Sequence, residues 1–245
     1  MTAPAAVASA RAGLPPGPWY RRLHLLLGLQ SLVVVLVSVN RLSTAGLGYV
    51  AGNQFLRWVD LGNLLLALAS TLVSYLVLRH LEANAPAPGR AAGVLLFGFV
   101  VATFVLGVSY GEHELTNYLH ARFCDPGTGD LCRLIVFHDD SFSHWLFFAS
   151  FLTISLLLMA GQALWPAGRA PNGADFALLS VNALFIGAGI FANLGFEVIG
   201  LDLYVVAAVA LAALVLLWRR GRQPVLVYYA VAYLVGLVAT LAVKL

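Results

Sequence analysis

Long apolar runs alternate with short polar segments along most of the chain. A helix needs about 20 mostly apolar residues to cross a hydrocarbon layer of about 30 Å. Seven runs approach that length: residues 23–39, 61–78, 91–110, 145–164, 176–196, 203–218 and 225–243. Backbone amides in lipid must pair within their own segment, and the runs lack the polar–apolar alternation of a transmembrane strand. The pattern therefore predicts an all-α polytopic membrane protein, a bundle of about seven transmembrane helices.

The amino-terminal segment differs from the rest of the chain. Residues 1–22 contain four prolines and many alanines, which predicts a disordered cytoplasmic tail ahead of a seven-helix domain at 23–245. A cleaved signal peptide is the alternative interpretation of the first apolar run. That run continues into Asn40 and Arg41 without a small-x-small cleavage pattern, so we expect it to remain as a helix.

The overall composition supports the membrane assignment. Hydrophobic residues make up 61% of the chain and charged residues 10%, and the mean hydropathy is +0.88. A soluble domain of this size does not have such a composition. The single lysine, Lys244, lies at the carboxyl end, which excludes a retinal pigment bound through a lysine in the middle of the last helix.

Basic residues are concentrated at alternate helix ends, and such residues are retained on the cytoplasmic side. With the amino end inside, nine of the 14 basic residues are cytoplasmic: Arg11, Arg21, Arg22, Arg79, Arg90, Arg169, Arg219, Arg220 and Arg222. We therefore expect an external carboxyl end and a non-cytoplasmic loop at 111–144, in a plasma or inner membrane. The net charge of +3 reflects this topology. The arginines are scattered at helix ends and do not form a basic surface with aromatic residues between them, which argues against nucleic acid as a partner.

The two cysteines, Cys124 and Cys132, both fall in the segment expected outside. The residues between them include the turn formers Asp125, Pro126 and Gly127, which can bring the two thiols within bridging distance. We predict a disulfide formed in an oxidising compartment. A pair of metal thiolates is the alternative, although the spacing matches no common zinc motif.

Four of the six histidines cluster between the third and fourth apolar runs, in GEHELTNYLHARFC and FHDDSFSHW. His113, Asn117 and His120 share one face if the helix continues through them. Asp140 and His144 repeat the four-residue spacing further on. Neutral imidazoles and carboxylates ligate zinc, iron or copper. We predict one divalent metal, with zinc favoured, held by His113, His120, His138 and His144.

Acidic side chains surround these histidines. Glu112, Glu114, Asp139 and Asp140 could orient the ligating imidazoles, and Glu114 or Asp140 is the expected general base. The alternative is a polar loop without a metal, in which Asp139 and Asp140 cap the next helix. The segment contains no metalloenzyme motif such as HExxH, so it is a local enrichment of ligand residues and not a signature.

Polar residues inside the apolar runs predict a pocket that opens on the same side. Polar groups in lipid usually face the interior of a bundle or a cavity, although small and amide residues also serve helix packing. One stripe follows the fifth run and another follows the second. The residues expected to line the pocket are Asp60, Asn63, Asn117, Asn193 and Glu197.

These features support three classes of function. The first is a metal-dependent membrane enzyme, a hydrolase or an oxidoreductase of a lipid-like substrate at the external boundary, because zinc lowers the pKa of bound water to about 7 and iron or copper suits oxidation. The second is an ion transporter or channel, although few ionisable residues continue inward past Asn182. The third is a non-catalytic membrane subunit or receptor-like protein. Membrane lipid is the expected partner in all three.

Overall fold

The computed structural model describes residues 16–85, 89–124, 129–196 and 201–245. Within these ranges the chain is helical and contains no β-strand. The elements are α1 (Pro16–Leu42), η1 (Thr44–Leu47), α2 (Trp58–Glu82), α3 (Arg90–Phe123), α4 (Asp130–Phe137), η2 (His138–Phe142), α5 (Ser143–Leu164), α6 (Gly173–Phe196), α7 (Leu201–Arg220) and α8 (Pro224–Lys244). Seven helices in the described ranges are long and apolar enough to cross a membrane. The predicted all-α architecture with seven long apolar helices is thereby confirmed.

Helix α1 begins before the first apolar run. Its first residue is Pro16, and proline is tolerated in the first turn because the amide there has no helical partner. Trp19, Tyr20 and Leu23 are almost fully buried, so burial of this face stabilises the added turns. Residues 16–22 of the predicted tail therefore belong to α1. Residues 1–15 lie outside the described part of the chain.

The segment 111–144, predicted as an external loop, is helical over most of its length. Helix α3 has 34 residues, which corresponds to about 51 Å and exceeds a hydrocarbon layer of about 30 Å. Beyond the connection at 124–129, α4, η2 and α5 follow one another as a continuous helical rod. Helix continues here because the polar side chains of α3 and η2 are paired with one another, as described below.

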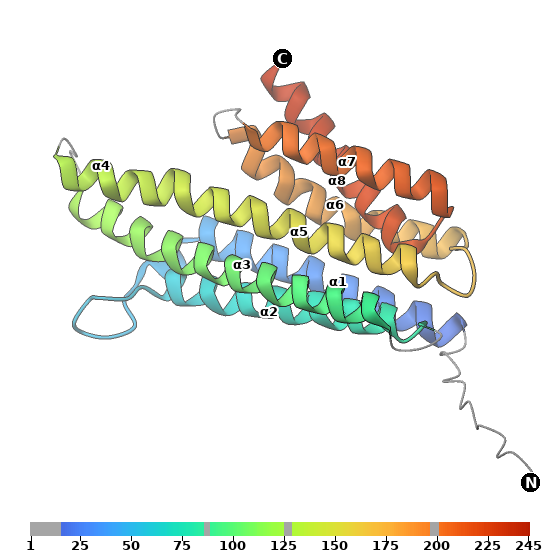
Figure 1. Ribbon diagram of the computed structural model, residues 1–245. Helices are drawn as coiled ribbons and strands as arrows, with labels where there is room; N and C mark the ends of the chain where they lie inside the picture. Colours follow the sequence, from blue (N-terminus) through green and yellow to red (C-terminus); the bar gives the residue numbers. More distant parts are fainter. Residues whose placement is uncertain (1–15, 86–88, 125–128, 197–200) are drawn as a thin grey trace, which may run out of the picture.

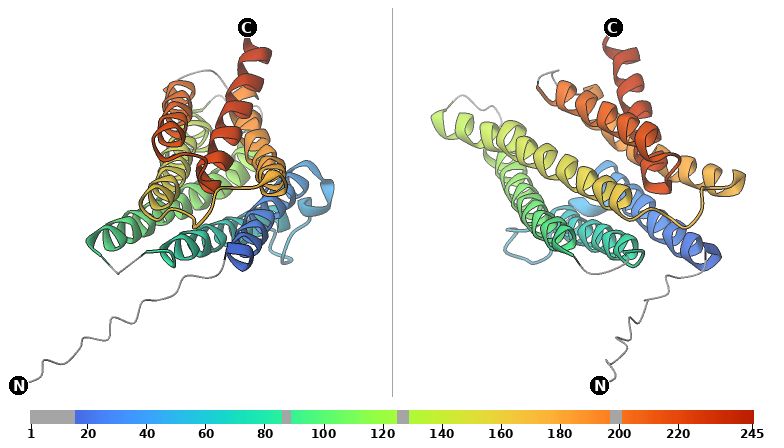
Figure 2. Two further views of the ribbon diagram at one scale, coloured as in Figure 1. Left: turned by 90° about the vertical axis from the view of Figure 1, so that its right-hand side faces the viewer. Right: turned by 45° about the vertical axis from the view of Figure 1, so that its right-hand side comes forward.

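The helices form two groups, α1 to α3 and α5 to α8 (Figures 1 and 2). The groups meet along α1, α3 and α5. Helices α1, α2 and α3 lie side by side, and α5 runs along α3. Helix α8 packs most extensively against α6 and also contacts α7, while α1 joins the groups through α6. Leu23, Met159 and Tyr233 are fully buried in the core, whereas Phe97 and Phe104 point outward and are 72% exposed. Such apolar outer faces suit a lipid environment.

One end of the bundle, called here the disulfide end, contains Cys124 and Cys132. Their sulfur atoms lie at disulfide-bonding distance and their Cα atoms are 5.4 Å apart. The pair fastens the end of α3 to α4, as the cysteine spacing predicts. The turn residues 125–128 lie outside the described part of the chain. The loop before α2 belongs to the same end, because Tyr118 donates a hydrogen bond to the backbone carbonyl of Gln54.

Replacing Cys124 and Cys132 with serine is expected to lower the free energy of unfolding by about 2–3 kcal/mol, because the disulfide closes a short loop in the unfolded chain. Thermal unfolding of the purified protein in detergent measures this change. Intact-mass analysis with and without reductant provides the direct check. Two free thiols in protein isolated without reductant from an oxidising compartment would contradict the disulfide.

The opposite end of the bundle gathers the loops that carry most of the arginines. The Tyr20 hydroxyl of α1 donates to the backbone carbonyl of Arg169, in the loop between α5 and α6, at 2.9 Å. The side chain of Gln223, next to α8, accepts a hydrogen bond from the Ala167 amide at 2.8 Å. The start of α1, the loop between α5 and α6 and the start of α8 are therefore neighbours.

Candidate functional site

The helical turn η2 places Asp139 between two histidines of α3. It is a π-helical turn, a rare element that often occurs at functional sites. The Asp139 side chain is 1% exposed, and its Oδ2 lies 3.0 Å from Nδ1 of His120. Its Oδ1 lies 3.1 Å from Nδ1 of His113, but that nitrogen is better aligned with the Asp139 backbone carbonyl oxygen, 3.4 Å away. Oδ1 is therefore a buried carboxylate oxygen without an aligned donor.

A buried carboxylate oxygen that accepts no well-aligned hydrogen bond is costly, so the position favours an added cation or water. Side-chain ligand atoms of His120, Asp139 and Asp140 all lie within 4.8 Å of one another. Modest side-chain rotations could direct the three groups toward one ion. One imidazole and two carboxylates, with a position left for water, fit the three-ligand pattern of catalytic zinc sites.

Arg41, at the end of α1, links the histidines to a buried polar network. Its Nη1 lies 3.1 Å from Nε2 of His113, and its Nη2 donates to Oε1 of Glu114 at 2.9 Å. The other oxygen of Glu114 accepts a hydrogen bond from Asn63 at 3.0 Å, and the oxygen of Asn63 accepts one from Asn40 at 2.8 Å. Because the guanidinium is a donor, it faces an unprotonated Nε2, the nitrogen that a metal would otherwise use on His113.

A second ion pair at the disulfide end lies at the start of α2 and contacts α3. Asp60 is 3% exposed and accepts two hydrogen bonds from the Arg57 guanidinium, at 2.9 and 2.8 Å. The hydrogen-bonded Asp60 carboxylate raises the pKa of Arg57 above its ordinary value. Arg57 also donates to the side-chain oxygen of Asn117 at 3.2 Å. This pair fixes the start of α2 against α3.

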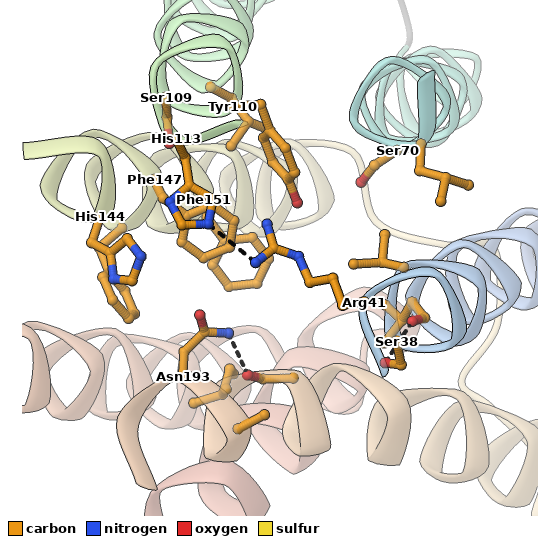
Figure 3. A pocket seen from close by; sticks show the side chains of 18 of the residues that line it. Ser38, Arg41, Ser70, Ser109, Tyr110, His113, His144, Phe147, Phe151 and Asn193 are labelled. Atoms are coloured by element: carbon orange, nitrogen blue, oxygen red, sulfur yellow. Dashed lines mark hydrogen bonds between the residues drawn. The ribbon is translucent and has the colours of Figure 1, made fainter. Parts of the chain in front are cut away.

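A cavity of about 470 Å³ lies beside this network, between α1, α2, α3, α5, α6 and α7. Its polar rim is formed by Arg41, His113, Asp140, His144 and Asn193. Figure 3 shows Arg41 extending into the space between the α3 histidine and α6, with Asn193 opposite. The rings of His113 and His144 lie 5.2 Å apart between centroids. The cavity therefore presents imidazole, guanidinium and carboxylate groups close to the Asp139 cluster.

Most of the other residues that line the cavity are aliphatic or aromatic, among them Leu106, Phe147 and Phe151. Gln30 and Ser70 also line it, and Gln30 Nε2 donates a hydrogen bond to Ser70 Oγ at 2.7 Å. The oxygen of Gln30, Oε1, is buried and has no hydrogen-bond partner among the described residues. The cavity lining thus combines polar and apolar groups.

The four predicted metal ligands do not form one group in the structure. His120 belongs to the group with Asp139 and Asp140, and His113 lies on the other side of the Asp139 carboxylate. His144 packs beside His113 at the cavity rim. His138 instead pairs with Glu112, so the structure does not bring it into this group.

The predicted general bases and pocket residues also separate into groups. Asp140 lines the cavity, together with Asn117 and Asn193. Glu114 is only 5% exposed and has hydrogen bonds to both of its carboxylate oxygens. Of the other predicted pocket residues, Asp60 and Asn63 are buried and hydrogen-bonded and do not line the cavity. Glu197 lies outside the described residues.

Several important residues were not selected from the sequence. In the sequence Arg41 only follows the first apolar run and Gln30 lies inside that run, so an isolated polar residue is the one signal that each provides. At the opposite end, Asp175 of α6 is 7% exposed and pairs with His24 of α1 and with Arg169. This second cluster connects α1, α6 and the loop between α5 and α6, and its contacts support a structural role.

The fold and the site define an all-helical protein with seven helices long and apolar enough to cross a membrane, and with a histidine–carboxylate cluster around the buried Asp139 beside a cavity. No protein-family model, curated protein sequence or solved structure matches the chain. The function therefore has to be inferred from the geometry.

Proposed function

We propose that the protein is a metal-dependent membrane hydrolase that acts on a lipid-like substrate. The observation that carries the proposal is the Asp139 carboxylate, which is buried between His113 and His120 and has one oxygen without an aligned donor. Asp140 of the same turn both belongs to the ligand group and lines the cavity. A metal held there would be next to any molecule in the cavity.

The proposed ligands are His120, Asp139 and Asp140, with zinc favoured because both ligand types, imidazole and carboxylate, suit it. When bound, the metal would lower the pKa of a water ligand to about 7 and supply hydroxide at neutral pH. Hydrolysis consumes this water: its oxygen bonds to the acyl carbon of the substrate, the bond to the leaving group breaks, and the leaving group takes up a proton. His144, at the cavity rim, is the proposed carrier of that proton.

Glu114 and Arg41 have supporting roles in this proposal. Both oxygens of Glu114 are hydrogen-bonded, and one of them holds the Arg41 guanidinium. Arg41 in turn faces the substrate space and His113 (Figure 3). Of the two predicted general bases, Asp140 is the one beside the cavity. Glu114 is better suited to positioning Arg41, whose charge would stabilise an oxyanion.

Apolar packing along α1 beyond the cavity favours a binding cavity over an ion pathway. Gln30 is the cavity-lining residue of α1 that lies farthest from the disulfide end. Farther along α1, the side chains of Leu23, Leu26 and Leu27 are each no more than 5% exposed and belong to the apolar core. These leucines separate the cavity from the polar cluster at the opposite end, where His24 lies. An apolar layer of this kind opposes passage of an ion.

The proposed orientation puts the disulfide end on the non-cytoplasmic side, in a plasma or inner membrane. The structure groups eight described arginines near the opposite end: Arg21, Arg22, Arg79, Arg90, Arg169, Arg219, Arg220 and Arg222. Basic residues at helix ends are retained in the cytoplasm, and a disulfide forms in an oxidising compartment. Both considerations lead to the same orientation.

Single cysteines introduced at the two ends test this orientation, in a background lacking the native cysteine pair. Gly52 and Gly168 are suitable because a Cβ at either position meets no atom within 4 Å. We expect an impermeant maleimide to label Gly52→Cys in intact cells, and Gly168→Cys only after permeabilisation. The reverse pattern would show that the orientation is inverted.

Metal content of the purified protein tests the proposed activity class. We expect about one zinc per chain in the wild type and loss of that metal in His120→Ala. His138→Ala is the matched control, because the two histidine side chains are 37% and 36% exposed and only His120 belongs to the ligand group. Equal metal content in both variants, or no metal in wild-type protein after reconstitution with zinc, would remove the basis for a metalloenzyme.

A further inference from the structure

The connection between α7 and α8 carries three arginines within four residues: Arg219, Arg220 and Arg222. All three are exposed, and none of them belongs to a described ion pair. The two described acids at this end of the bundle, Glu82 and Asp175, each form a salt bridge with another arginine. The chain contains no acidic residue after Asp202. The positive charge of this turn is therefore not compensated by a described acid.

The backbone holds these arginines on one short turn. Helix α7 ends at Arg220, and Gly221 adopts a left-handed conformation with a φ of 73° that reverses the chain. The Gln223 amide donates a hydrogen bond to the Gly221 carbonyl oxygen at 2.7 Å. The Gln223 side chain accepts a hydrogen bond from the Ala167 amide at 2.8 Å, which fastens the turn to the loop between α5 and α6. The backbone that carries the arginines is thus ordered before a ligand binds, and such order lowers the cost of binding.

An outward-facing apolar stripe on α7 leads to this turn. Four exposed side chains share one face of the helix: Leu211, Leu214, Val215 and Trp218. On the other side of the helix, Val206 and Ala213 are fully buried in the core. Trp218 is 82% exposed, and tryptophan is enriched where a membrane helix passes from hydrocarbon into the headgroup layer. Along α7 the surface therefore changes from aliphatic to aromatic and then to positively charged.

We propose that this surface of α7 and the α7–α8 turn binds an anionic phospholipid. Its acyl chain lies along the stripe that ends at Trp218, and its phosphodiester lies at the three arginines. A guanidinium presents a planar pair of donors that matches phosphate oxygens. A zwitterionic phospholipid carries its own cation, which these arginines repel. The proposal does not depend on the hydrolase, because this surface and the Asp139 cluster lie at opposite ends of the bundle.

Two triple variants with the same change of charge test the site. The first carries Arg219→Gln, Arg220→Gln and Arg222→Gln. The control carries Arg21→Gln, Arg22→Gln and Arg90→Gln. The control arginines are also exposed and belong to no described ion pair. They lie at the starts of α1 and α3, on another part of the same end of the bundle (Figure 2).

Native mass spectrometry of the delipidated full chain in detergent compares phosphatidylglycerol with phosphatidylcholine of the same acyl chains. Each arginine near an anionic headgroup contributes roughly a fivefold gain in binding. The first variant should therefore bind phosphatidylglycerol at least about tenfold more weakly than the wild type. The control should stay within about threefold at about 0.15 M salt, where charges are screened over about 8 Å.

Three outcomes of this experiment would overturn the proposal. An equal loss in both variants would show attraction to the overall charge of this end without a site on α7. Equal affinity of the wild type for the two lipids would remove the role of the anionic headgroup. Displacement of phosphatidylglycerol by an equal concentration of water-soluble glycerophosphate would show that the turn binds free phosphate and not a lipid.

A fluorescence measurement keeps the arginines unaltered. The emission of Trp218 is the difference between the wild type and Trp218→Phe, because the chain contains five tryptophans. Phosphatidylglycerol with brominated acyl chains is expected to quench this emission more than brominated phosphatidylcholine at the same fraction of lipid. Raising the salt concentration to about 0.5 M should reduce the difference, because it screens the charges of the turn. Equal quenching by the two lipids at low salt would contradict the proposal.

Discussion

Asp139→Asn is expected to weaken zinc binding at least tenfold. If Asp139 orients His120 and does not itself ligate the metal, the expected loss is about 10–100-fold. The substitution keeps the size of the side chain but removes the negative charge that lies between His113 and His120. Competition of the purified protein against a chelator of known affinity measures the change. The effect should be large because Asp139 is 1% exposed, so water does not replace the lost charge.

Asp130→Asn provides the control for this experiment. Asp130 is also at the disulfide end of the bundle, where it begins α4. Its side chain is 91% exposed and, among the described ion pairs, pairs only with the exposed Arg133. Zinc affinity should be unchanged in this variant. If both variants weakened zinc binding equally, the effect would come from the overall charge of this end, and the buried cluster would have no specific role.

Asp60→Asn is expected to lower the free energy of unfolding by about 3 kcal/mol, because it leaves the largely buried Arg57 guanidinium without its charged partner. For a chain of this size, that loss corresponds to a fall in the melting temperature of about 6–12 °C. Thermal unfolding in a fixed detergent measures it. An arginine side chain stays charged across the accessible pH range even without Asp60, so a change of pH is not expected to rescue the variant.

The same Asp130→Asn variant is a close control for stability. Asp130 and Arg133 form a salt bridge and are three residues apart in the sequence, as Arg57 and Asp60 are. The side chains of Asp130 and Arg133, however, are 91% and 73% exposed. Exposed pairs contribute about 0–1 kcal/mol, so this variant should melt within about 3 °C of the wild type. An equal fall in melting temperature in both variants would show that burial of the Arg57–Asp60 pair adds nothing to stability.

The sequence by itself determined the secondary structure class and the number of long apolar helices. Runs of about 20 apolar residues have one stable form in lipid, since the helix alone pairs every backbone amide within the segment. The cysteine pair was also predictable, because Cys124 and Cys132 are close in sequence and turn-forming residues lie between them. These features depend on local pattern.

The candidate site was predictable in part. The histidine-rich segment contains the residues that the structure groups around Asp139, and helical spacing put His113 and His120 on one face of α3. Asp139 is one of four acids that the sequence offers as partners of the imidazoles, and its position between those two histidines depends on a π-helical turn. Helical spacing alone does not predict such a turn.

The tertiary structure decided which polar groups meet. Arg41 lies 72 residues from His113 in the sequence, and the two side chains are 3.1 Å apart. Gln30 and Gly189 come from apolar segments of different helices, and the packing of α1, α2, α3, α5, α6 and α7 makes both part of one cavity. Helix packing in membranes depends on the close fit of many side chains and small residues. The sequence pattern specifies which segments become helices, whereas their relative rotation determines which polar side chains face one another.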